Sequence, residues 1–270
     1  MKISAVILTK NEEKNIEKCL ESLFWCDEII IVDDYSEDQT LKKIKDGIKV
    51  YQRHVDSDFA LQRNFGLEKA TSDWVLFVDA DEVISDELAK EIIKATSTLS
   101  SRVRQSADVA ISEIASSKSP RNDNLSGFYI PRKDYIFGKL LKYGETGNIK
   151  FIRLAKKGSG LWEGRVHEVW KINGIVKGLR NPILHYPHQS IFEFLNDINW
   201  YTDLVAQYWK EEGRKISFWE IIVYPVGKFI QNYIFRLGFL DGTAGLVLAV
   251  FMSFHSFSAR SKYWLMNNRK

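Results

Sequence analysis

Hydrophobic positions in the first hundred residues alternate between short continuous runs and helical spacing. The apolar runs typical of buried strands lie at 3–9, at 28–33, around Val50 and at 74–78. The segments with helical spacing between them are 11–23, 38–45, 59–70 and 85–99. Because strands that alternate with helices pair in parallel through right-handed crossovers, we expect an α/β fold. Its core would be a Rossmann-like, mostly parallel sheet flanked by helices.

The pattern changes twice in the rest of the chain. Residues 100–126 are rich in Ser, Asn, Asp, Arg and Lys and have little apolar periodicity, which predicts a mobile insertion. Residues 128–184 are rich in aromatic and β-branched residues, which predicts short strands that complete the sheet. Three helices are expected after them, at 192–210, 217–237 and 243–264. We therefore divide the chain into a sheet domain, 1–187, and a helical C-terminal region, 188–270.

Composition and charge narrow the class of protein. The chain has 270 residues, of which 45% are hydrophobic, enough to bury a substantial core. Its 38 basic and 35 acidic residues nearly cancel, so no overall field favours nucleic acid as a partner. Cys19 and Cys26 form neither a disulfide framework nor a zinc motif, which favours a reducing cytosol. The apolar run before Lys10 is too short for a signal peptide.

Three polar loops directly follow predicted strands. They are TKNEE at 9–13, DDYS at 33–36 and DAD at 79–81. Open parallel sheets bind ligands at the carboxyl ends of their strands. We therefore expect the three loops to share one rim of the sheet and to form the functional site.

Asp79 and Asp81 leave the apolar run 74–78 at positions i and i+2, so their carboxylates can converge on one cation. Oxygen ligands favour Mg²⁺ or Mn²⁺. Such an ion could bridge a diphosphate and stabilise the charge on a departing nucleoside diphosphate. The alternative is structural, with Asp81 or Ser85 capping the following helix.

The other two loops present a similar choice. Asp33 and Asp34 could accept hydrogen bonds from a nucleobase or from ribose hydroxyls, or they could cap the helix expected near Asp38. Asn11 could contact a ligand or cap the helix that begins there, with Lys10 in solvent.

The three loops, in this order and at this spacing, resemble glycosyltransferase family 2 through ILTKNE at 7–12, IVDDYS at 31–36 and VDAD at 78–81. The resemblance covers residues 1–185. It implies a GT-A fold, a nucleotide-diphospho-sugar donor, a divalent metal and inversion at the anomeric carbon. Arg63 is similar to a family residue that approaches the diphosphate, although it could instead lie on a solvated helix face. The donor-binding residues expected on this basis are Thr9, Asn11, Glu12, Asp33, Asp34, Arg63, Asp79, Ala80 and Arg153.

A second pair of segments resembles one branch of the family. FIRL at 151–154 and WEGRVHE at 162–168 resemble the branch that includes bacterial lipopolysaccharide-core β-1,4-glucosyltransferases. The Glu-Asp motif that supplies the base in many members is absent here. We expect Glu168 to be the base, because direct attack by an acceptor hydroxyl requires a carboxylate that receives its proton. His167 would be a third metal or diphosphate contact beside Asp79 and Asp81, or else a hydrogen-bonded core histidine.

Several other residues remain candidates. Glu163 and Glu145 are the next choices for the base. Arg153 and Arg165 could bind phosphate through bidentate contacts, or form ion pairs with nearby acids. Trp162 could stack on a sugar, although large aromatic side chains more often fill a core.

Together these features predict an inverting, metal-dependent hexosyltransferase. The donor would be a nucleotide-sugar, with UDP-sugars favoured, and the acceptor a glycan or a lipid-linked glycan of the lipopolysaccharide core or a related envelope polymer. A nucleotidyltransferase is one rival, but it needs a glycine-rich phosphate loop, and the loop 9–13 has no glycine. A non-catalytic nucleotide-sugar-binding scaffold is the other, and the intact pair Asp79 and Asp81 argues against it.

The tail at 218–263 interleaves Trp, Tyr and Phe with Lys and Arg, a composition typical of the boundary between lipid headgroups and acyl chains. The uncharged run 242–259 is near the minimum length of a spanning helix. The alternatives are interfacial helices, a membrane span, or packing against the catalytic domain or against a second subunit of a homodimer. We favour the first, which predicts a cytoplasmic protein in peripheral contact with the inner face of the cytoplasmic membrane.

Overall fold

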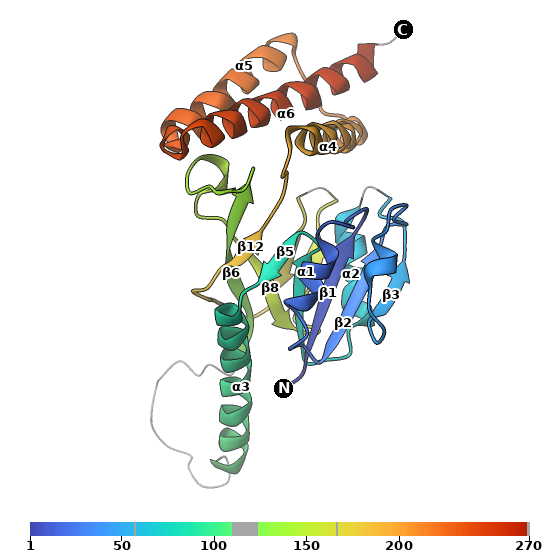
Figure 1. Ribbon diagram of the computed structural model, residues 1–270, viewed down its shortest axis with the longest axis vertical. Helices are drawn as coiled ribbons and strands as arrows, with labels where there is room; N and C mark the ends of the chain where they lie inside the picture. Colours follow the sequence, from blue (N-terminus) through green and yellow to red (C-terminus); the bar gives the residue numbers. More distant parts are fainter. Residues whose placement is uncertain (57, 110–123, 166, 269–270) are drawn as a thin grey trace. The chain divides into compact units, whose positions relative to one another are not determined.

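The chain forms two compact units, shown in a computed structural model (Figure 1). The described residues are 1–56, 58–109, 124–165 and 167–268, with the backbone alone described over 98–109. We name the two units the sheet unit (Met1–Arg132 and Lys150–Leu184) and the helical unit (Lys133–Ile149 and His185–Lys270). Most of the insertion expected at 100–126 lies outside the described residues.

Four parallel strands form one half of the sheet, in the spatial order β3, β2, β1, β4. They are β1 (Ile3–Thr9), β2 (Glu28–Asp33), β3 (Lys49–Gln52) and β4 (Trp74–Asp79). The helices α1 (Ile16–Glu21) and α2 (Phe59–Lys69) lie between β1 and β2 and between β3 and β4 in the chain. The expected alternation of strands and helices around a parallel core is therefore confirmed.

The segment 38–45 departs from the sequence prediction of a helix. It contains only one 3₁₀ turn, η1 (Leu41–Lys43). The carboxylate of Asp38 accepts hydrogen bonds from the backbone N–H of Thr40 (2.8 Å) and of Glu13 (3.1 Å). The local bond to Thr40 competes with helical bonds and favours a turn, and the bond to Glu13 ties this turn to the first loop, so the predicted helix was wrong.

Alternate residues of β1 face two different apolar layers. Ile3 and Ile7 pack in the layer that includes α1, whereas Val6 packs in the layer that includes α2. The second layer is very tight, since a Cβ atom added to Gly66 would lie 2.5 Å from Cγ1 of Val6. A glycine at this position lets α2 approach the sheet, and this places Arg63 of the same helix near the strands.

The other half of the sheet is antiparallel. β8 (Lys150–Lys156) pairs antiparallel with both β4 and β6 (Leu125–Ile136). The remaining elements of the sheet unit and its edge are β5 (Glu82–Ile84), α3 (Asp86–Val109), β9 (Gly160–Glu163), β10 (Val169–Ile172), β11 (Ile175–Gly178) and β12 (Ile183–His185). The short strands expected over 128–184 are confirmed, whereas α3 continues to Val109 beyond its expected end at Leu99.

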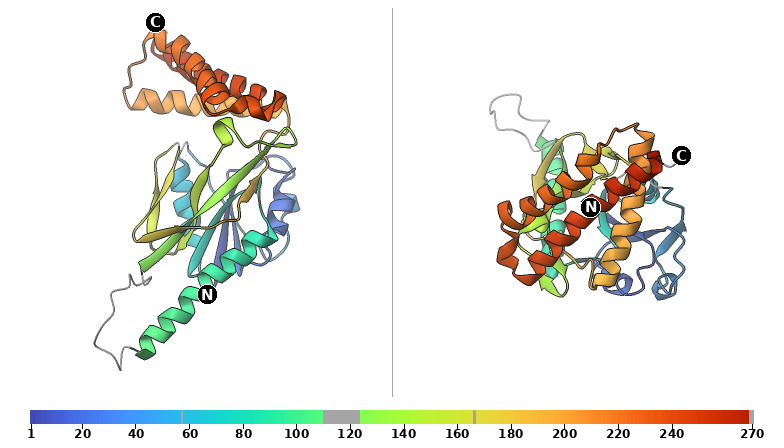
Figure 2. Two further views of the ribbon diagram at one scale, coloured as in Figure 1. Left: turned by 90° about the vertical axis from the view of Figure 1, so that its left-hand side faces the viewer. Right: turned by 90° about the horizontal axis from the view of Figure 1, so that it is seen from above.

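Three long helices dominate the helical unit. They are α4 (Ile191–Glu211), α5 (Phe218–Ile230) and α6 (Thr243–Asn268), and both α4 and α5 pack against α6 (Figure 2). The helix expected at 217–237 instead ends in a π-helical turn, η4 (Gln231–Phe235), and a 3₁₀ turn, η5 (Gly238–Asp241). No helix of the described residues has both the length and the apolar character needed to cross a membrane.

The helical unit also contains residues that the sequence placed in the domain 1–187. The segment 133–149 includes β7 (Lys139–Leu140) and the 3₁₀ turn η3 (Gly144–Thr146). Burial of apolar side chains is the cause, because these residues share one cluster with α4 and α6, made of Ile136, Leu141, Phe194, Ile198 and Leu248.

Asp241 joins this segment to the helices. Its buried carboxylate accepts hydrogen bonds from the backbone N–H groups of Lys142 (3.1 Å) and Tyr143 (2.9 Å), and its carbonyl accepts one from Nζ of Lys139 (2.6 Å). We expect Asp241→Ala to lower the free energy of unfolding by about 1–3 kcal/mol, because buried donors lose their acceptor. Urea unfolding followed by circular dichroism measures the change.

A matched control is Asp203→Ala, which removes the ion pair between the exposed carboxylate of Asp203 and the partly buried Lys262. Exposed pairs contribute about 0–1 kcal/mol, so this variant should unfold close to the wild type. Equal losses in the two variants would show that the buried carboxylate of Asp241 has no special role.

Candidate active site

The strand ends expected to form the site do lie together. Leu8 pairs with Asp79, and Thr9 pairs with Asp33, across the neighbouring strands. The backbone N–H of Asp34 also donates to the carbonyl of Thr9 (2.9 Å). The expected shared rim is therefore confirmed by the register of the parallel strands.

Asn11 and Glu12 bond the first loop to the second. The N–H of Asn11 donates to Oγ of Ser36 (2.8 Å), and its Oδ1 accepts from the N–H of Glu37 (2.8 Å). The N–H of Glu12 donates to Oγ1 of Thr40 (2.7 Å). Asn11 has a φ of +54°, a conformation that asparagine tolerates well, so the expected cap at this position is not formed.

Asp33 and Asp34 have different environments. Asp33 is fully buried and accepts hydrogen bonds from the N–H of Ser36 (3.0 Å) and from Nε2 of Gln52 (3.1 Å). Asp34 lies nearer the surface and pairs with Nζ of Lys10 at 2.7 Å. Asp33 therefore fixes the loop from inside, while the carboxylate of Asp34, which is also buried, joins Lys10 of the first loop to Val55 after β3.

Tyr35 and His54 form an aromatic pair that sequence reasoning missed. Their rings are stacked with centroids 4.1 Å apart, and both side chains are exposed. Nδ1 of His54 lies 3.3 Å from Oδ1 of Asp34. The available signal was that β3 is a parallel strand of the same sheet, so the loop after it also reaches this rim.

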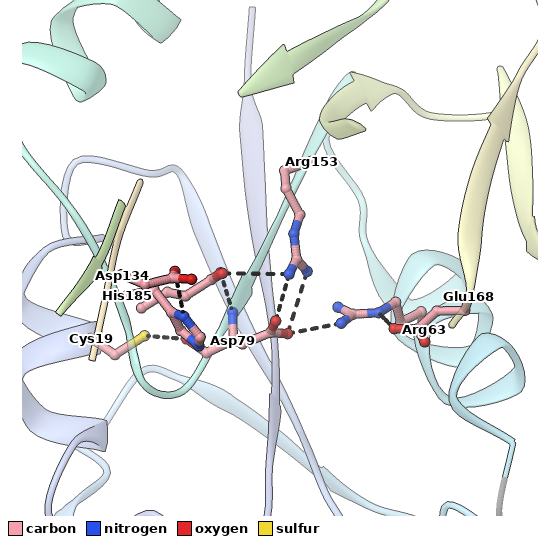
Figure 3. Close-up of polar contacts among 8 residues, drawn as sticks. Cys19, Arg63, Asp79, Asp134, Arg153, Glu168 and His185 are labelled. Atoms are coloured by element: carbon pink, nitrogen blue, oxygen red, sulfur yellow. Dashed lines mark hydrogen bonds and ion pairs between the residues drawn. The ribbon is translucent and has the colours of Figure 1, made fainter. Parts of the chain in front are cut away.

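Two arginines converge on Asp79 at the end of β4 (Figure 3). Arg63 reaches it from α2, with Nη2 at 2.9 Å from Oδ1. Arg153 reaches it from β8, with Nη2 at 2.6 Å from Oδ2 and Nη1 at 3.4 Å from Oδ1. Both guanidinium groups are buried, whereas the side chain of Asp79 is 27% exposed. Asp79 is thus the shared partner of both cations.

Glu82 and Glu168 extend the network at its two ends. Oε1 of Glu168 lies 2.7 Å from Nε of Arg63. The fully buried Glu82 lies 3.4 Å from Nη2 of Arg153 and accepts the backbone N–H of Asp79 at 2.9 Å. Three carboxylates therefore surround two guanidinium groups, and sequence reasoning had missed Glu82.

The network changes the proton affinity of its members. Burial by itself would raise the pKa of Asp79, but the charges and hydrogen bonds of Arg153 and Arg63 outweigh it and hold that pKa well below its ordinary value. Burial alone would lower the pKa of Arg153, but the carboxylates of Asp79 and Glu82 raise it further above its ordinary value. The ion pairs are therefore charged throughout the neutral range.

The other expected metal contacts are more dispersed. Ala80 is buried, Asp81 is partly buried in the turn between β4 and β5, and His167 is exposed with a φ of +65°. Ser85 caps α3, since its Oγ accepts the N–H of Leu88 (3.3 Å). Within the described part of the chain, no three His, Cys, Asp or Glu side chains are placed to hold a metal ion.

The remaining candidates have other partners. Glu163 pairs with Lys171 on the β9–β10 hairpin (2.5 Å). Glu145 belongs to the helical unit and pairs with Lys228 (2.9 Å). Arg165 lies 3.9 Å from Asp58 at the start of α2. The ion-pair alternative therefore describes the contact of Arg165, and the two glutamates are also held in ion pairs.

Trp162 fills the core and supports Arg63. It is buried, and its ring stacks on Trp170 and meets Phe77 edge-on, with centroids 5.3 Å and 5.0 Å away. The guanidinium carbon of Arg63 lies 4.7 Å from the centroid of the Trp162 ring. This cation–π contact helps to hold Arg63 in place.

Two buried polar atoms of site residues have no hydrogen-bond partner among the described residues. They are Oγ1 of Thr9 and Nη1 of Arg63. An unsatisfied buried polar group costs about 1–3 kcal/mol, which a bound polar ligand or water can recover. The residues at this rim therefore fit a ligand that carries hydrogen-bonding groups.

Comparison with known proteins identifies the family of this chain. Glycosyl transferase family 2 matches residues 4–158. The lipopolysaccharide core biosynthesis glycosyltransferase LpsC of Rhizobium meliloti (strain 1021) is 27% identical over 275 residues, which cover 97% of this chain and 92% of that protein. An uncharacterized glycosyltransferase of Rickettsia typhi is 28% identical over 268 residues, which cover 97% and 86% of the two chains.

A solved structure is similar over nearly the whole chain. The structure of Staphylococcus aureus TarS 1–349 in complex with UDP matches 99% of this chain and 91% of that chain, with 16% identity and a TM-score of 0.45. The family match covers more than half of the sequence, so this chain belongs to glycosyl transferase family 2. Its sheet unit has the expected GT-A fold, and the protein is a glycosyltransferase.

We expect Arg153→Met to weaken the pH dependence of stability in the acid range. In the wild type the pKa of Asp79 is depressed, so its stabilising effect is complete above the unfolded pKa of about 3.9 and is lost as the pH falls below it. Without Arg153, the depressed pKa of Asp79 should rise toward the unfolded value, because only Arg63 then offsets the cost of burial. The variant should then lose much of the stabilisation that the wild type gains as the pH rises through the acid range.

Urea unfolding at several pH values measures this effect. At the upper pH values the variant should be about 3–5 kcal/mol less stable than the wild type, as for other buried pairs that lose one partner. Lys171→Met, which breaks the exposed pair with Glu163, is the control and should follow the wild-type profile. A constant difference between Arg153→Met and the wild type at all pH values would contradict the assignment.

Proposed function

We propose that this glycosyltransferase transfers a hexose, with inversion, from a UDP-sugar to a hydroxyl of a glycan or glycolipid acceptor. The observation that carries the proposal is the pair of buried arginines held by Asp79 on the rim where β1, β2 and β4 end. A rim with paired cations beside an exposed aromatic pair suits a ligand with a diphosphate at one end and a base at the other.

The nucleoside would bind near Asp34. Its carboxylate can accept a hydrogen bond from a base N–H, and the exposed stack of Tyr35 on His54 offers an aromatic surface beside it. Thr9 would contribute its unsatisfied hydroxyl. Asn11, Glu12 and Asp33 would act indirectly, by holding the loops in place.

The diphosphate would lie against Arg63 and Arg153. Guanidinium groups bind phosphate oxygens in a planar, often bidentate, arrangement. Asp79 would keep both groups in one orientation before the donor arrives, so less conformational entropy is lost on binding. This assigns Asp79 to positioning the arginines rather than to direct metal binding, because both of its oxygens already accept guanidinium hydrogen bonds.

A divalent cation would complete the donor site. Mg²⁺ in phosphate sites is commonly held by one or two carboxylates, with substrate oxygens and water completing its shell. Asp81 would be the carboxylate that holds it, with Ala80 setting the backbone and His167 as a further candidate contact. The ion, when bound, would stabilise the charge on the departing nucleoside diphosphate.

Glu168 would act as the base. Only Oε1 takes part in the ion pair with Arg63, and the side chain is 16% exposed. The acceptor O–H would give its proton to this carboxylate as the acceptor oxygen bonds to the anomeric carbon. The bond from that carbon to the diphosphate oxygen would break on the opposite face, which inverts the configuration. Arg63 would then link the base to the donor site.

The acceptor would belong to the cell envelope. The proposal rests on the name of the Rhizobium relative, which is a lipopolysaccharide core biosynthesis enzyme and aligns over nearly the whole chain. Such acceptors are carried on lipid, so we place the protein in the cytoplasm with peripheral contact to the inner face of the membrane. A non-catalytic scaffold is the rival proposal, and the donor-turnover assays below distinguish the two.

Asp81→Ala should reduce release of UDP from a UDP-hexose by at least about a hundredfold, because the departing diphosphate loses its cation. Binding of Mn²⁺, followed by electron paramagnetic resonance in the presence of UDP, should fall in parallel. Asp46→Ala, at an exposed position outside the site, is the control. Unchanged Mn²⁺ binding in Asp81→Ala would refute the metal assignment. If the wild type releases no UDP with any metal, donor or acceptor, the non-catalytic scaffold is favoured.

Glu168→Gln should keep the affinity for UDP-sugar within about threefold but slow transfer to an acceptor by about 10²–10⁴. Calorimetry and single-turnover transfer measure the two quantities. Glu163→Gln on the neighbouring hairpin is the matched control and should transfer normally. If Glu163→Gln is the slow variant, the base has been assigned to the wrong acid.

A further inference from the structure

Helix α5 carries an exposed apolar face. Phe218, Trp219, Ile222, Val223 and Val226 are each between 47% and 69% exposed. Successive helical residues are about 100° apart, so these five side chains fall within an arc of about 140° that contains no charged residue. An arc of this kind on a short helix marks an interaction surface.

Helix α6 and the turns before it continue this exposed apolar surface. Five residues of α6 are between 36% and 48% exposed and recur at helical spacing, namely Leu246, Val250, Phe254, Phe257 and Trp264. The turns between the two helices expose five more, namely Ile234, Phe235, Leu237, Phe239 and Leu240. α5 and α6 lie side by side in both views (Figures 1 and 2).

The core of the helical unit does not use these side chains. The buried residues Ile221 and Pro225 lie on the other side of α5, and Leu248 and Ala249 are buried on α6. The exposed face therefore remains available for a partner after the helices have packed on each other.

The charge of this part of the chain favours a negative partner. Residues 213–268 contain six Lys and Arg but only two acidic residues, a net charge of +4. One of the two acids, Asp241, is buried and bonded to backbone N–H groups. A second copy of this chain would bring the same positive charge to the face, whereas an anionic surface would be attracted to it.

A basic cavity lies beside the apolar face. Its volume is about 410 Å³, and its lining has three cations and no acid: Lys210, Gly213, Arg214, Lys215, Ile216, Tyr263, Trp264, Asn267 and Asn268. The guanidinium carbon of Arg214 lies 4.4 Å from the ring centroid of Trp209, which holds it in place. Arginine and lysine side chains that line one cavity suit a phosphate group.

The cavity and the exposed apolar surface share a residue and lie close together in the sequence. Trp264 lines the cavity and also belongs to the exposed stripe of α6, and Lys215 is only three residues from Phe218.

We propose that the helical unit docks on an anionic phospholipid bilayer, with the apolar face of α5 at the acyl boundary and a lipid headgroup phosphate in the cavity. Tryptophan side chains such as Trp219 suit this depth. The proposal depends on the proposed function only for the membrane location of the acceptor.

Co-sedimentation of the full-length protein with vesicles tests the proposal. Binding to phosphatidylcholine vesicles that contain about 30% phosphatidylglycerol should exceed binding to pure phosphatidylcholine by at least about tenfold, and should weaken as salt is added. Ile222→Glu with Val226→Glu, and separately Arg214→Glu with Lys215→Glu, should each remove most of this binding. Ile93→Glu, an exposed apolar position on α3 of the sheet unit, is the matched control and should bind normally.

Three results would overturn the docking proposal. The first is equal binding to neutral and anionic vesicles, and the second is normal binding by both double variants. The third is a wild-type dimer in solution that the α5 variant, Ile222→Glu with Val226→Glu, converts to a monomer while vesicle binding stays unchanged. Inorganic phosphate, added at the same concentration as the phosphate of the vesicle lipids, should not displace the protein from the vesicles. Full displacement by inorganic phosphate would assign the cavity to a free anion instead.

Donor turnover separates this proposal from the proposed function. Release of UDP from a UDP-hexose in vesicle-free buffer should be unchanged in the α5 and Arg214 variants, which also shows that they fold. Loss of vesicle binding with normal UDP release supports the docking surface. If the wild type releases UDP normally but does not bind anionic vesicles, the docking proposal is rejected and the glycosyltransferase assignment remains valid.

Discussion

Two guanidinium groups are buried at the end of β4, and this is possible only because carboxylates neutralise them. Asp79 accepts from both Arg63 and Arg153, and Glu168 and Glu82 complete the network. Burying a charge without a partner costs several kcal/mol, so the helix, strand and loop that carry these residues are coupled to one another. The tight approach of α2 at Gly66 brings Arg63 to this network, and the contact of Arg63 with the Trp162 ring helps to hold it there.

The same arrangement prepares the site for an anionic ligand. The arginines are oriented before any ligand binds, at a rim where Asp34, Tyr35 and Thr9 are also found. A diphosphate would meet fixed donors, and the charge that develops on it during transfer would be stabilised without rearrangement.

The pattern of apolar runs followed by polar residues was sufficient to locate the strand ends, but not the residues from other segments that pair with them. Thr9, Asp33 and Asp79 each follow an apolar run, and parallel strands bring such ends to one edge. The pairing of Arg153 with Asp79 depends on β8 lying antiparallel to β4, with Leu154 opposite Leu76, and that contact between distant segments leaves no periodic signal in the chain. Glu82 was missed because its pairing with Arg153 also spans distant segments, whereas the position of His54 after β3 was a usable signal.

Local chemistry also misled the prediction in places. The helix expected at 38–45 is replaced by a turn because the Asp38 carboxylate bonds to nearby N–H groups. The helix expected at 217–237 stops early, with Leu237 at a φ of +58°. The segment 133–149 joins the helices through its apolar side chains, which depends on three-dimensional packing.

The central claim is that Asp79 acts by positioning two arginines for the donor diphosphate. Calorimetric titration with UDP and with uridine, on Asp79→Asn, Arg153→Lys and the double variant, tests it most directly. Each single variant should weaken UDP binding by about 10–100-fold while leaving uridine binding unchanged, and the double variant should be no weaker than either, because the residues act as one unit. Additive losses, or equal losses for UDP and uridine, would contradict this account.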